Sequence, residues 1–102
     1  MIHLIAIVTA KPGKRADVLA LVRANVPLVQ AEQGCIEYSP LIDADESQNK
    51  FGGDTFVVVE KWLNEAALAG HRTTAHMAEY AAKSKAFVQN RSIYLLRSVP
   101  ME

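Results

Sequence analysis

The sequence predicts an α+β fold in which a four-stranded antiparallel sheet carries two helical segments, in the order β-α-β-β-α-β. Three patterns support this prediction. Residues 2–10 are apolar on both alternating faces, which is typical of a central strand covered on two sides. Apolar residues recur at helical spacing over 15–32. Residues 55–62 alternate in the manner of a strand with one buried face.

The first helix is bounded by residues that favour turns. It follows the turn sequence 11–14, which contains Pro12 and Gly13, and we expect Gly34 to end it. Pro27 lies inside the predicted helix and should kink it, because proline removes a backbone donor and clashes with the preceding turn.

A second strand and a long loop follow this helix. A strand over 35–42 would place Ile36, Tyr38 and Ile42 on one face. The polar stretch 43–54 predicts a long loop, and loops of about 12 residues or more tend to be functional or mobile connections.

The second helical region is expected to consist of two pieces. Asn64 is a suitable N-cap, a break is expected near Arg72, and Thr74 would cap the continuation. A last strand is expected over 92–99. Two stripes of the second piece would face inward, with His76, Tyr80, Lys83 and Phe87 on one and Met77, Ala81, Ser84 and Val88 beside it. This order of elements is that of the ferredoxin-like folds.

Both helices would cover the same face of this sheet and leave the other face bare. In the first strand the bare face is also apolar. A second copy of the chain packed sheet against sheet would cover it, so we expect a homodimer.

Composition excludes several classes of function. The 102 residues predict a single domain over 1–102, and the 11 basic and 11 acidic side chains balance and form no long block. This predicts neither a nucleic-acid partner nor a membrane surface. No stretch approaches the length of a membrane span. The single cysteine, Cys35, excludes an internal disulfide and fits a reducing compartment, so a cytoplasmic location is expected.

Metal and nucleotide sites are not expected either. His71 and His76 lie five positions apart and would point about 140° apart on a continuous helix, which is unfavourable for shared metal ligation. The turn 11–14 offers a single glycine, too few for a phosphate-binding loop, so neither flavin nor nicotinamide is expected. Cys35 begins a strand rather than a helix, which does not favour a reactive thiolate.

The remaining chemistry points to an aromatic pocket between the sheet and the second helical region. His76 begins a helix, where the helix dipole disfavours the imidazolium and would keep the ring ready to accept a proton. We therefore take His76 as the preferred base and His71 as the second candidate, although a structural role fits both residues. Flat apolar walls with few polar groups suit a small aromatic ligand. The candidate ligand-binding residues are Tyr38, Phe51, Glu60, Trp62, Met77, Tyr80 and Phe87; ordinary core packing is the alternative for Met77 and Phe87.

The chain also resembles a known family along nearly its whole length. The resemblance is carried by Gly34-Cys35 before Tyr38, by Val59-Glu60-Lys61-Trp62, by Leu68 and His71, and by Thr74-Ala75-His76-Met77 before Tyr80. These residues, in this order and spacing, resemble the antibiotic biosynthesis monooxygenase family of small dimeric ferredoxin-like α+β barrels. Pro27, Pro40, Asp43, the long loop and His76-Met77 are most similar to its bacterial quinol monooxygenase branch.

Two other branches of this family match less well. The heme-degrading branch carries an asparagine in its first strand, which is missing here, and its tryptophan position corresponds to His71. The branch that isomerises a phosphorylated sugar would need a basic pocket, and only Arg72 and Lys83 stand near the expected site.

The resemblance implies a monooxygenase that uses neither metal nor flavin and oxidises a hydroquinone or polyphenol with O2 to a quinone. A histidine would remove a phenolic proton, and Glu60 would either orient that histidine or pair with a cationic side chain. Two alternatives stay open from the residues alone. One is a binding module that holds a quinone or other aromatic metabolite without turnover, and the other is a small-molecule isomerase of the same fold.

Overall fold

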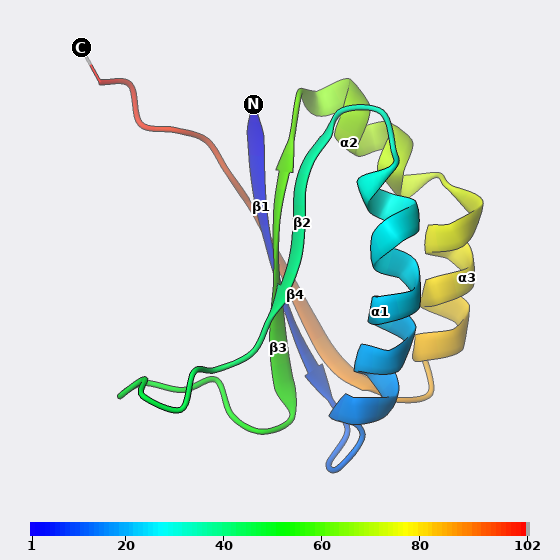
Figure 1. Cartoon of the computed structure of the whole chain (residues 1–102), viewed down its shortest axis with the longest axis vertical. Helices are drawn as coiled ribbons and strands as arrows, with labels where there is room; N and C mark the ends of the chain where they lie inside the picture. The colour runs from blue at the N-terminus through cyan, green and yellow to red at the C-terminus, as the bar shows by residue number, and fades with distance from the viewer. Residues whose placement is uncertain (102) are drawn as a thin grey trace.

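The computed structural model describes residues 1–101 and contains the expected antiparallel sheet with its helices on one face (Figure 1). The chain runs through β1 (Ile2–Ala10), α1 (Arg15–Gln30), β2 (Cys35–Leu41), β3 (Thr55–Trp62), α2 (Glu65–Arg72), α3 (Ala75–Ser84) and β4 (Val88–Leu96). The strand order is β2-β3-β1-β4, and all three pairings are antiparallel. This is the ferredoxin-like α+β arrangement that the sequence predicts, with the second helical region divided into α2 and α3.

The core lies between the sheet and the helices, and β3 supplies much of it. Phe56, Val58, Glu60 and Trp62 point to the helical side as predicted, and all four are buried. β1 contributes Leu4, Ala6 and Val8, while α1 contributes Val18, Val22 and Val29. None of the helices in the described part of the chain is long and apolar enough to span a membrane.

Three expected boundaries were wrong. β4 begins at Val88 and ends at Leu96, whereas the sequence pattern suggested 92–99. α3 ends at Ser84, so Phe87 and Val88 do not extend its inward stripes. α1 ends at Gln30, slightly before the expected end of the helical pattern near residue 32, and Pro27 lies inside it as the sequence predicts.

The expected face of β2 was also partly wrong, because the strand contains an irregularity. Its register against β3 shifts between Cys35 and Glu37, which leaves Ile36 as an extra residue. Tyr38 therefore points into the core, while Ile36 is 49% exposed instead of sharing the buried face.

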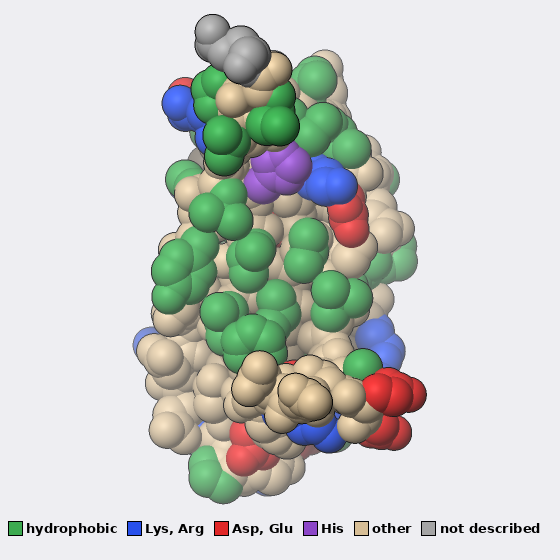
Figure 2. All heavy atoms as spheres, turned by 90° about the vertical axis from the view of Figure 1, so that its left-hand side faces the viewer, with side chains coloured by type: hydrophobic (Ala, Val, Ile, Leu, Met, Phe, Trp, Pro, Cys, Tyr) green, Lys and Arg blue, Asp and Glu red, His purple; other side chains and the backbone are tan. Residues whose placement is uncertain are grey.

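The sheet face opposite the helices is apolar and uncovered in the single chain (Figure 2). Directly paired residues share a face, so the pairs Ile5–Tyr94, Ile5–Val59 and Ile7–Val57 lie together there. Tyr94 and Leu96 at the β4 edge are 52% and 48% exposed. The sequence prediction of a bare apolar face is thus confirmed.

Candidate active site

Three polar side chains from distant parts of the sequence meet at one end of the helical layer. Glu32 lies in the turn between α1 and β2, His71 in the last turn of α2, and His76 in the first turn of α3. The Nδ1 atom of His71 lies 3.1 and 3.0 Å from the two carboxylate oxygens of Glu32. The Nε2 atom of His76 lies 2.7 Å from Glu32 Oε2. One carboxylate therefore binds two imidazoles.

The break between α2 and α3 brings the two histidines together. Thr74 caps α3 by accepting a hydrogen bond from the Met77 amide, and its own hydroxyl donates to the His71 carbonyl. Thr73 lies outside both helices and donates its hydroxyl to the Gly70 carbonyl. Because the helix is interrupted and redirected, the side chains of His71 and His76 approach the same group instead of diverging.

Glycine 34 brings the Glu32 turn close to α2. Gly34 has a φ of +83°, and a Cβ atom at this position would lie 2.5 Å from the Cβ of Ala67. Its carbonyl accepts a hydrogen bond from the Leu63 amide at 2.8 Å. A glycine is required here both by the left-handed backbone and by the contact with the helix.

His71 is buried among aromatic groups and is 4% exposed. Its ring lies 4.6 Å from the ring of Trp62 and 5.8 Å from that of Tyr38, centroid to centroid. Trp62 in turn donates its indole N–H to Glu60 Oε1 at 2.9 Å. Glu60 thus holds the tryptophan, and the charges of His71 and Arg72 act on its carboxylate without a direct hydrogen bond among the residues described.

His71 lines a cavity of about 120 Å³ between the sheet and α2–α3. An engineered apolar cavity of about 150 Å³ holds benzene, so this smaller space has room for no more than a single aromatic ring. Its polar lining groups are Tyr38, Glu60, His71, Arg72, Tyr80 and Arg91, and its apolar lining includes Leu4, Val58, Leu68 and Met77. Arg72 and Arg91 are exposed residues, so the cavity reaches the surface beside two cations.

Burial changes the acid–base behaviour of several groups near this cavity. It raises the pKa of Glu60, against the opposing hydrogen bond from Trp62 and the charge of His71. It also raises the pKa values of the Tyr38 and Tyr80 hydroxyls. Burial raises the pKa of the Cys35 thiol as well, and the nearby carboxylates act in the same direction. These shifts keep the Tyr38 and Tyr80 hydroxyls and the Cys35 thiol protonated at neutral pH.

The structure brings together most of the residues singled out in the sequence. Tyr38, Glu60, His71, Met77 and Tyr80 line the cavity, and Trp62 lies behind His71. His76 lines a separate, outer hollow together with Leu21, Ala24, Asn25, Leu28, Glu79, Tyr80 and Lys83.

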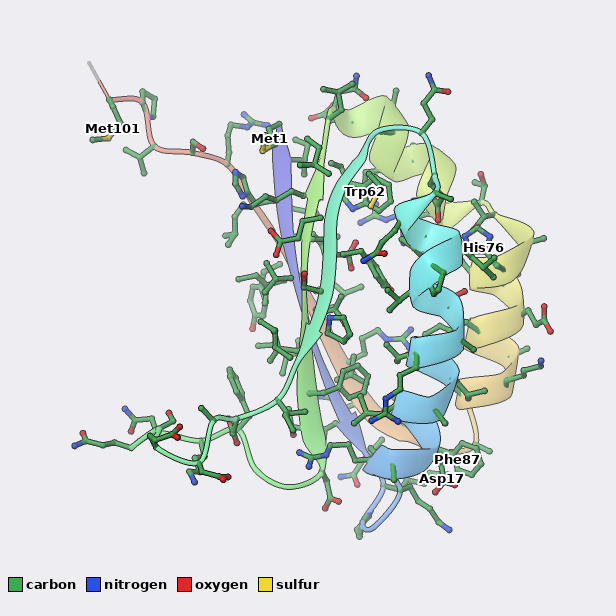
Figure 3. The ribbon with its side chains drawn as sticks, viewed as in Figure 1. Met1, Asp17, Trp62, His76, Phe87 and Met101 are labelled. Carbon is green, nitrogen blue, oxygen red and sulfur yellow. The ribbon has the colours of Figure 1, made fainter. Side chains whose placement is uncertain are left out.

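Two predicted wall residues are not brought to the cavity. Phe87 packs against the core at the far end of the helical layer from Trp62 and His76 (Figure 3). Phe51 is 60% exposed on the loop between β2 and β3. The carboxylate of Asp43 accepts hydrogen bonds from the Phe51 and Gly52 amides, which holds this loop in its own turn.

A larger hollow of about 440 Å³ lies outside this cavity and shares the His71 wall. It is lined by Glu32, Gln33, Gly34, Leu63, Asn64, Ala66, Ala67, Gly70, His71 and Thr74. His71 therefore separates an inner space from an outer one. Within residues 1–101 no group of three or more histidine, cysteine or acidic side chains is placed to hold a metal ion.

Comparisons with known proteins agree with this fold. The model of the family described as "Antibiotic biosynthesis monooxygenase" matches residues 1–83. The chain belongs to the antibiotic biosynthesis monooxygenase family. It is 34% identical over 101 residues to the Escherichia coli (strain K12) protein named "Probable quinol monooxygenase YgiN", a match that covers 95% of this chain and 97% of that one.

Solved structures of similar proteins show the same fold. The crystal structure of PA3566 from Pseudomonas aeruginosa has a TM-score of 0.83 and 31% identity, covering 97% of this chain and 94% of that chain. The structure of Rv0793 from Mycobacterium tuberculosis has a TM-score of 0.82 and 25% identity, covering 98% and 96%. The sequence-based assignment to the monooxygenase family is thus confirmed.

In this member of the monooxygenase family, sequence reasoning missed two residues of the site. Glu32 is 39 positions from His71 and 44 from His76, so no local spacing connects them. Arg91 was missed because the region before residue 92 was not expected to be a strand. Lys83, which sequence reasoning placed near the site, pairs with Glu79 at 2.7 Å on the surface of α3.

Proposed function

We propose that this protein is a cofactor-independent monooxygenase that oxidises a hydroquinone or polyphenol with O2 to a quinone. The observation that carries the proposal is the buried imidazole of His71, which is hydrogen-bonded to a carboxylate and lines a cavity of the size of one aromatic ring. Membership of the monooxygenase family and the name of the YgiN relative support the same reaction.

The proposed reaction begins with proton transfer from the phenol to an imidazole. The substrate O–H bond breaks, the nitrogen gains the proton, and the phenolate keeps the electron pair. The electron-rich phenolate passes one electron to O2, and the two radicals recombine to a peroxide anion, which takes back the proton from the imidazolium. Loss of hydrogen peroxide from this intermediate leaves the quinone. Where the carbon that bears the peroxide also carries a hydrogen, loss of water instead leaves one oxygen atom on the product. General-base assistance of this type contributes typically about 10²–10⁴-fold to the rate.

We assign the base to His71 rather than to His76, which the sequence alone had favoured. His71 lines the cavity, whereas His76 lines the outer hollow between α1 and α3. Tyr38, Met77 and Tyr80 would contact the aromatic ring, and Trp62 would support the imidazole from behind. A substrate that fills the cavity and displaces its water would protect the radical and peroxide intermediates.

Oxygen uptake by protein freed of metal and flavin tests this proposal. The substrates are benzohydroquinone and menadiol, with autoxidation in buffer as the background. We expect uptake above background that is lost in His71→Gln and retained in Lys11→Gln, a control at an exposed position in the turn between β1 and α1. A faster reaction with the single-ring substrate would agree with the cavity volume. Quenching of Trp62 fluorescence by a quinone without oxygen uptake would instead indicate a binding module.

We also propose that the protein acts as a homodimer in which the apolar sheet faces pack together. The face contains Ile5, Ile7, Val57, Val59, Tyr94 and Leu96. Large exposed apolar patches of this kind mark interaction sites. Sedimentation should give a dimer for the native chain and a monomer for Ile5→Lys. Leu28→Lys, an exposed apolar site on α1, is the matched control and should remain dimeric.

The single free cysteine supports placing the enzyme in a reducing compartment, the cytoplasm.

A further inference from the structure

The Glu32 carboxylate has two imidazole partners but does not line the inner cavity. It contacts the Nδ1 atom of His71 and the Nε2 atom of His76 at 3.0 and 2.7 Å. The Glu32 side chain is only 11% exposed, and those of His71 and His76 are 5% and 22% exposed. The three groups therefore form a nearly buried hydrogen-bonded series, His71–Glu32–His76, from the cavity wall to the outer surface.

The hydrogen bonds of the His71–Glu32–His76 series fix the positions of two protons. An ionised carboxylate can only accept hydrogen bonds, so each nitrogen that faces Glu32 must carry a proton. In neutral His71 the proton is then on Nδ1, and Nε2 keeps its lone pair. The same reasoning puts a proton on Nε2 of His76.

We propose that Glu32 is a positioning residue that makes His71 a base on the cavity side. Glu32 holds the ring in the Nδ1–H form and leaves Nε2 as the free nitrogen on the cavity wall. His76 donates to the same carboxylate and fixes its position from the outer surface. The part of this inference that concerns turnover rests on the proposed function, whereas the protonation pattern of His71 can be tested without it.

Glu32 also compensates the charge that proton transfer creates. When Nε2 of His71 takes the phenolic proton, the ring becomes a cation whose Nδ1–H still faces the carboxylate. An ion pair in a buried setting is stronger than the same pair in water, so this contact favours the charged product of the transfer. No proton has to move through Glu32 for this effect.

Other charged and titratable groups surround the three residues. Those facing His71 around the cavity are Tyr38 from β2, Glu60 from β3, Arg72 from α2, Tyr80 from α3 and Arg91 from β4. His76 has Glu79 and Lys83 beside it on α3. Among the residues described, Glu32 is the only carboxylate hydrogen-bonded to either ring, so its removal should change His71 most directly.

Nitrogen NMR of the histidine side chains tests the protonation pattern directly. The chain has three histidines, so His3→Gln and His76→Gln assign the ¹⁵N signals. At a pH where His71 is neutral, we expect the Nδ1–H form in the native protein. In Glu32→Ala we expect a change toward the Nε2–H form, which isolated histidine side chains favour. Glu37→Ala removes a glutamate that pairs with Lys61 on β3, and it should leave His71 unchanged.

The Nε2–H form in the native protein would overturn the inference, even if Glu32→Ala failed to fold. An unchanged His71 spectrum in folded Glu32→Ala would also overturn it. Neither result depends on turnover, so failure of this inference is distinguishable from failure of the proposed function.

A kinetic comparison applies once oxygen uptake is observed. We expect kcat/KM to fall by about 10²-fold or more in Glu32→Ala, because the base is no longer held in its reactive form. Glu32→Gln should lie between Glu32→Ala and the native protein, since its amide oxygen can still accept hydrogen bonds from the imidazoles but carries no charge. Equal kcat/KM values for Glu32→Ala and Glu37→Ala would contradict a positioning role.

Discussion

The contact between Gly34 and Ala67 provides the sharpest test of how the site is built. In Gly34→Ala the new Cβ atom would lie 2.5 Å from the Cβ of Ala67, closer than real Cβ contacts allow. Gly34 also has a φ of +83°, a backbone conformation that costs an L-residue about 1–2 kcal/mol. Overpacking of this kind adds about 1–3 kcal/mol. Because alanine also restricts the unfolded chain slightly, we expect a net loss of about 2–4 kcal/mol.

Gly13 is a matched control for the backbone contribution alone. It has a φ of +77°, but a Cβ atom there would have no neighbour within 4 Å. Gly13→Ala should therefore cost only about 1 kcal/mol, the backbone penalty reduced by the unfolded-state effect. The measurement is the free energy of unfolding from urea denaturation of both variants and the native chain. The comparison requires that the three proteins have the same m-value.

A double-mutant cycle isolates the steric part of the effect. Ala67→Gly removes the atom that the new Cβ would meet, at a cost of about 0.5–1 kcal/mol within a helix. In the Gly34→Ala, Ala67→Gly double variant we expect a favourable coupling of about 1–3 kcal/mol. Equal losses for Gly34→Ala and Gly13→Ala, or no coupling with Ala67→Gly, would refute the claim that this contact holds the Glu32 turn against α2.

Two further predictions concern Glu60 and its partner Trp62. Burial raises the pKa of Glu60 above its ordinary value of 4.5. Between these two pKa values the native state binds more protons than the unfolded state, so the contribution of Glu60 to stability falls as the pH rises from 4.5 through the native pKa. Urea midpoints of the native protein and Glu60→Gln should therefore agree near pH 4. At pH 7 the variant should be equally or more stable than the native protein. A difference between the two proteins that shifts in favour of the native protein from pH 4 to pH 7 would contradict this. Trp62→Phe removes the indole donor to Glu60 and should cost about 1.5–3 kcal/mol in the same assay. This loss should shrink in the presence of Glu60→Gln, because an unpaired amide is cheaper to bury than a carboxylate; an unchanged loss would show that the hydrogen bond is not its cause.

Much of the fold could be predicted because its signals are local. The alternation of Phe56, Val58, Glu60 and Trp62 placed one face of β3 in the core, and these residues are buried. The capping residues Asn64 and Thr74 located the starts of α2 and α3, because a side chain that accepts a backbone amide acts within three residues.

The errors arose where tertiary contacts override local pattern. The extra residue Ile36 in β2 comes from pairing with β3, which the alternation of β2 alone does not show. β4 extends back to Val88 because it pairs with β1 as far as Ala10, although residues 88–91 have a mixed pattern. Phe51 was expected at the pocket for its aromatic ring, but the direction of its loop depends on Asp43.

The candidate site could be predicted only in part for the same reason. His71, Tyr38 and Glu60 were found because rare polar and aromatic groups follow a buried strand or share its neighbourhood. Glu32 lies at the end of a helix where a solvated carboxylate is the ordinary expectation. Its role becomes visible only when the turn before β2 and the corner between α2 and α3 are placed together.

The capped corner at Thr73 and Thr74 has a consequence for how much length variation this region can accept. In an uninterrupted helix an inserted residue rotates everything after it by about 100°. Here α2 and α3 each have their own first-turn cap, so an insertion between them changes the connection without turning His71. Related chains could therefore differ in length at this corner and keep His71, Trp62 and the inner cavity in place while moving only the outer imidazole.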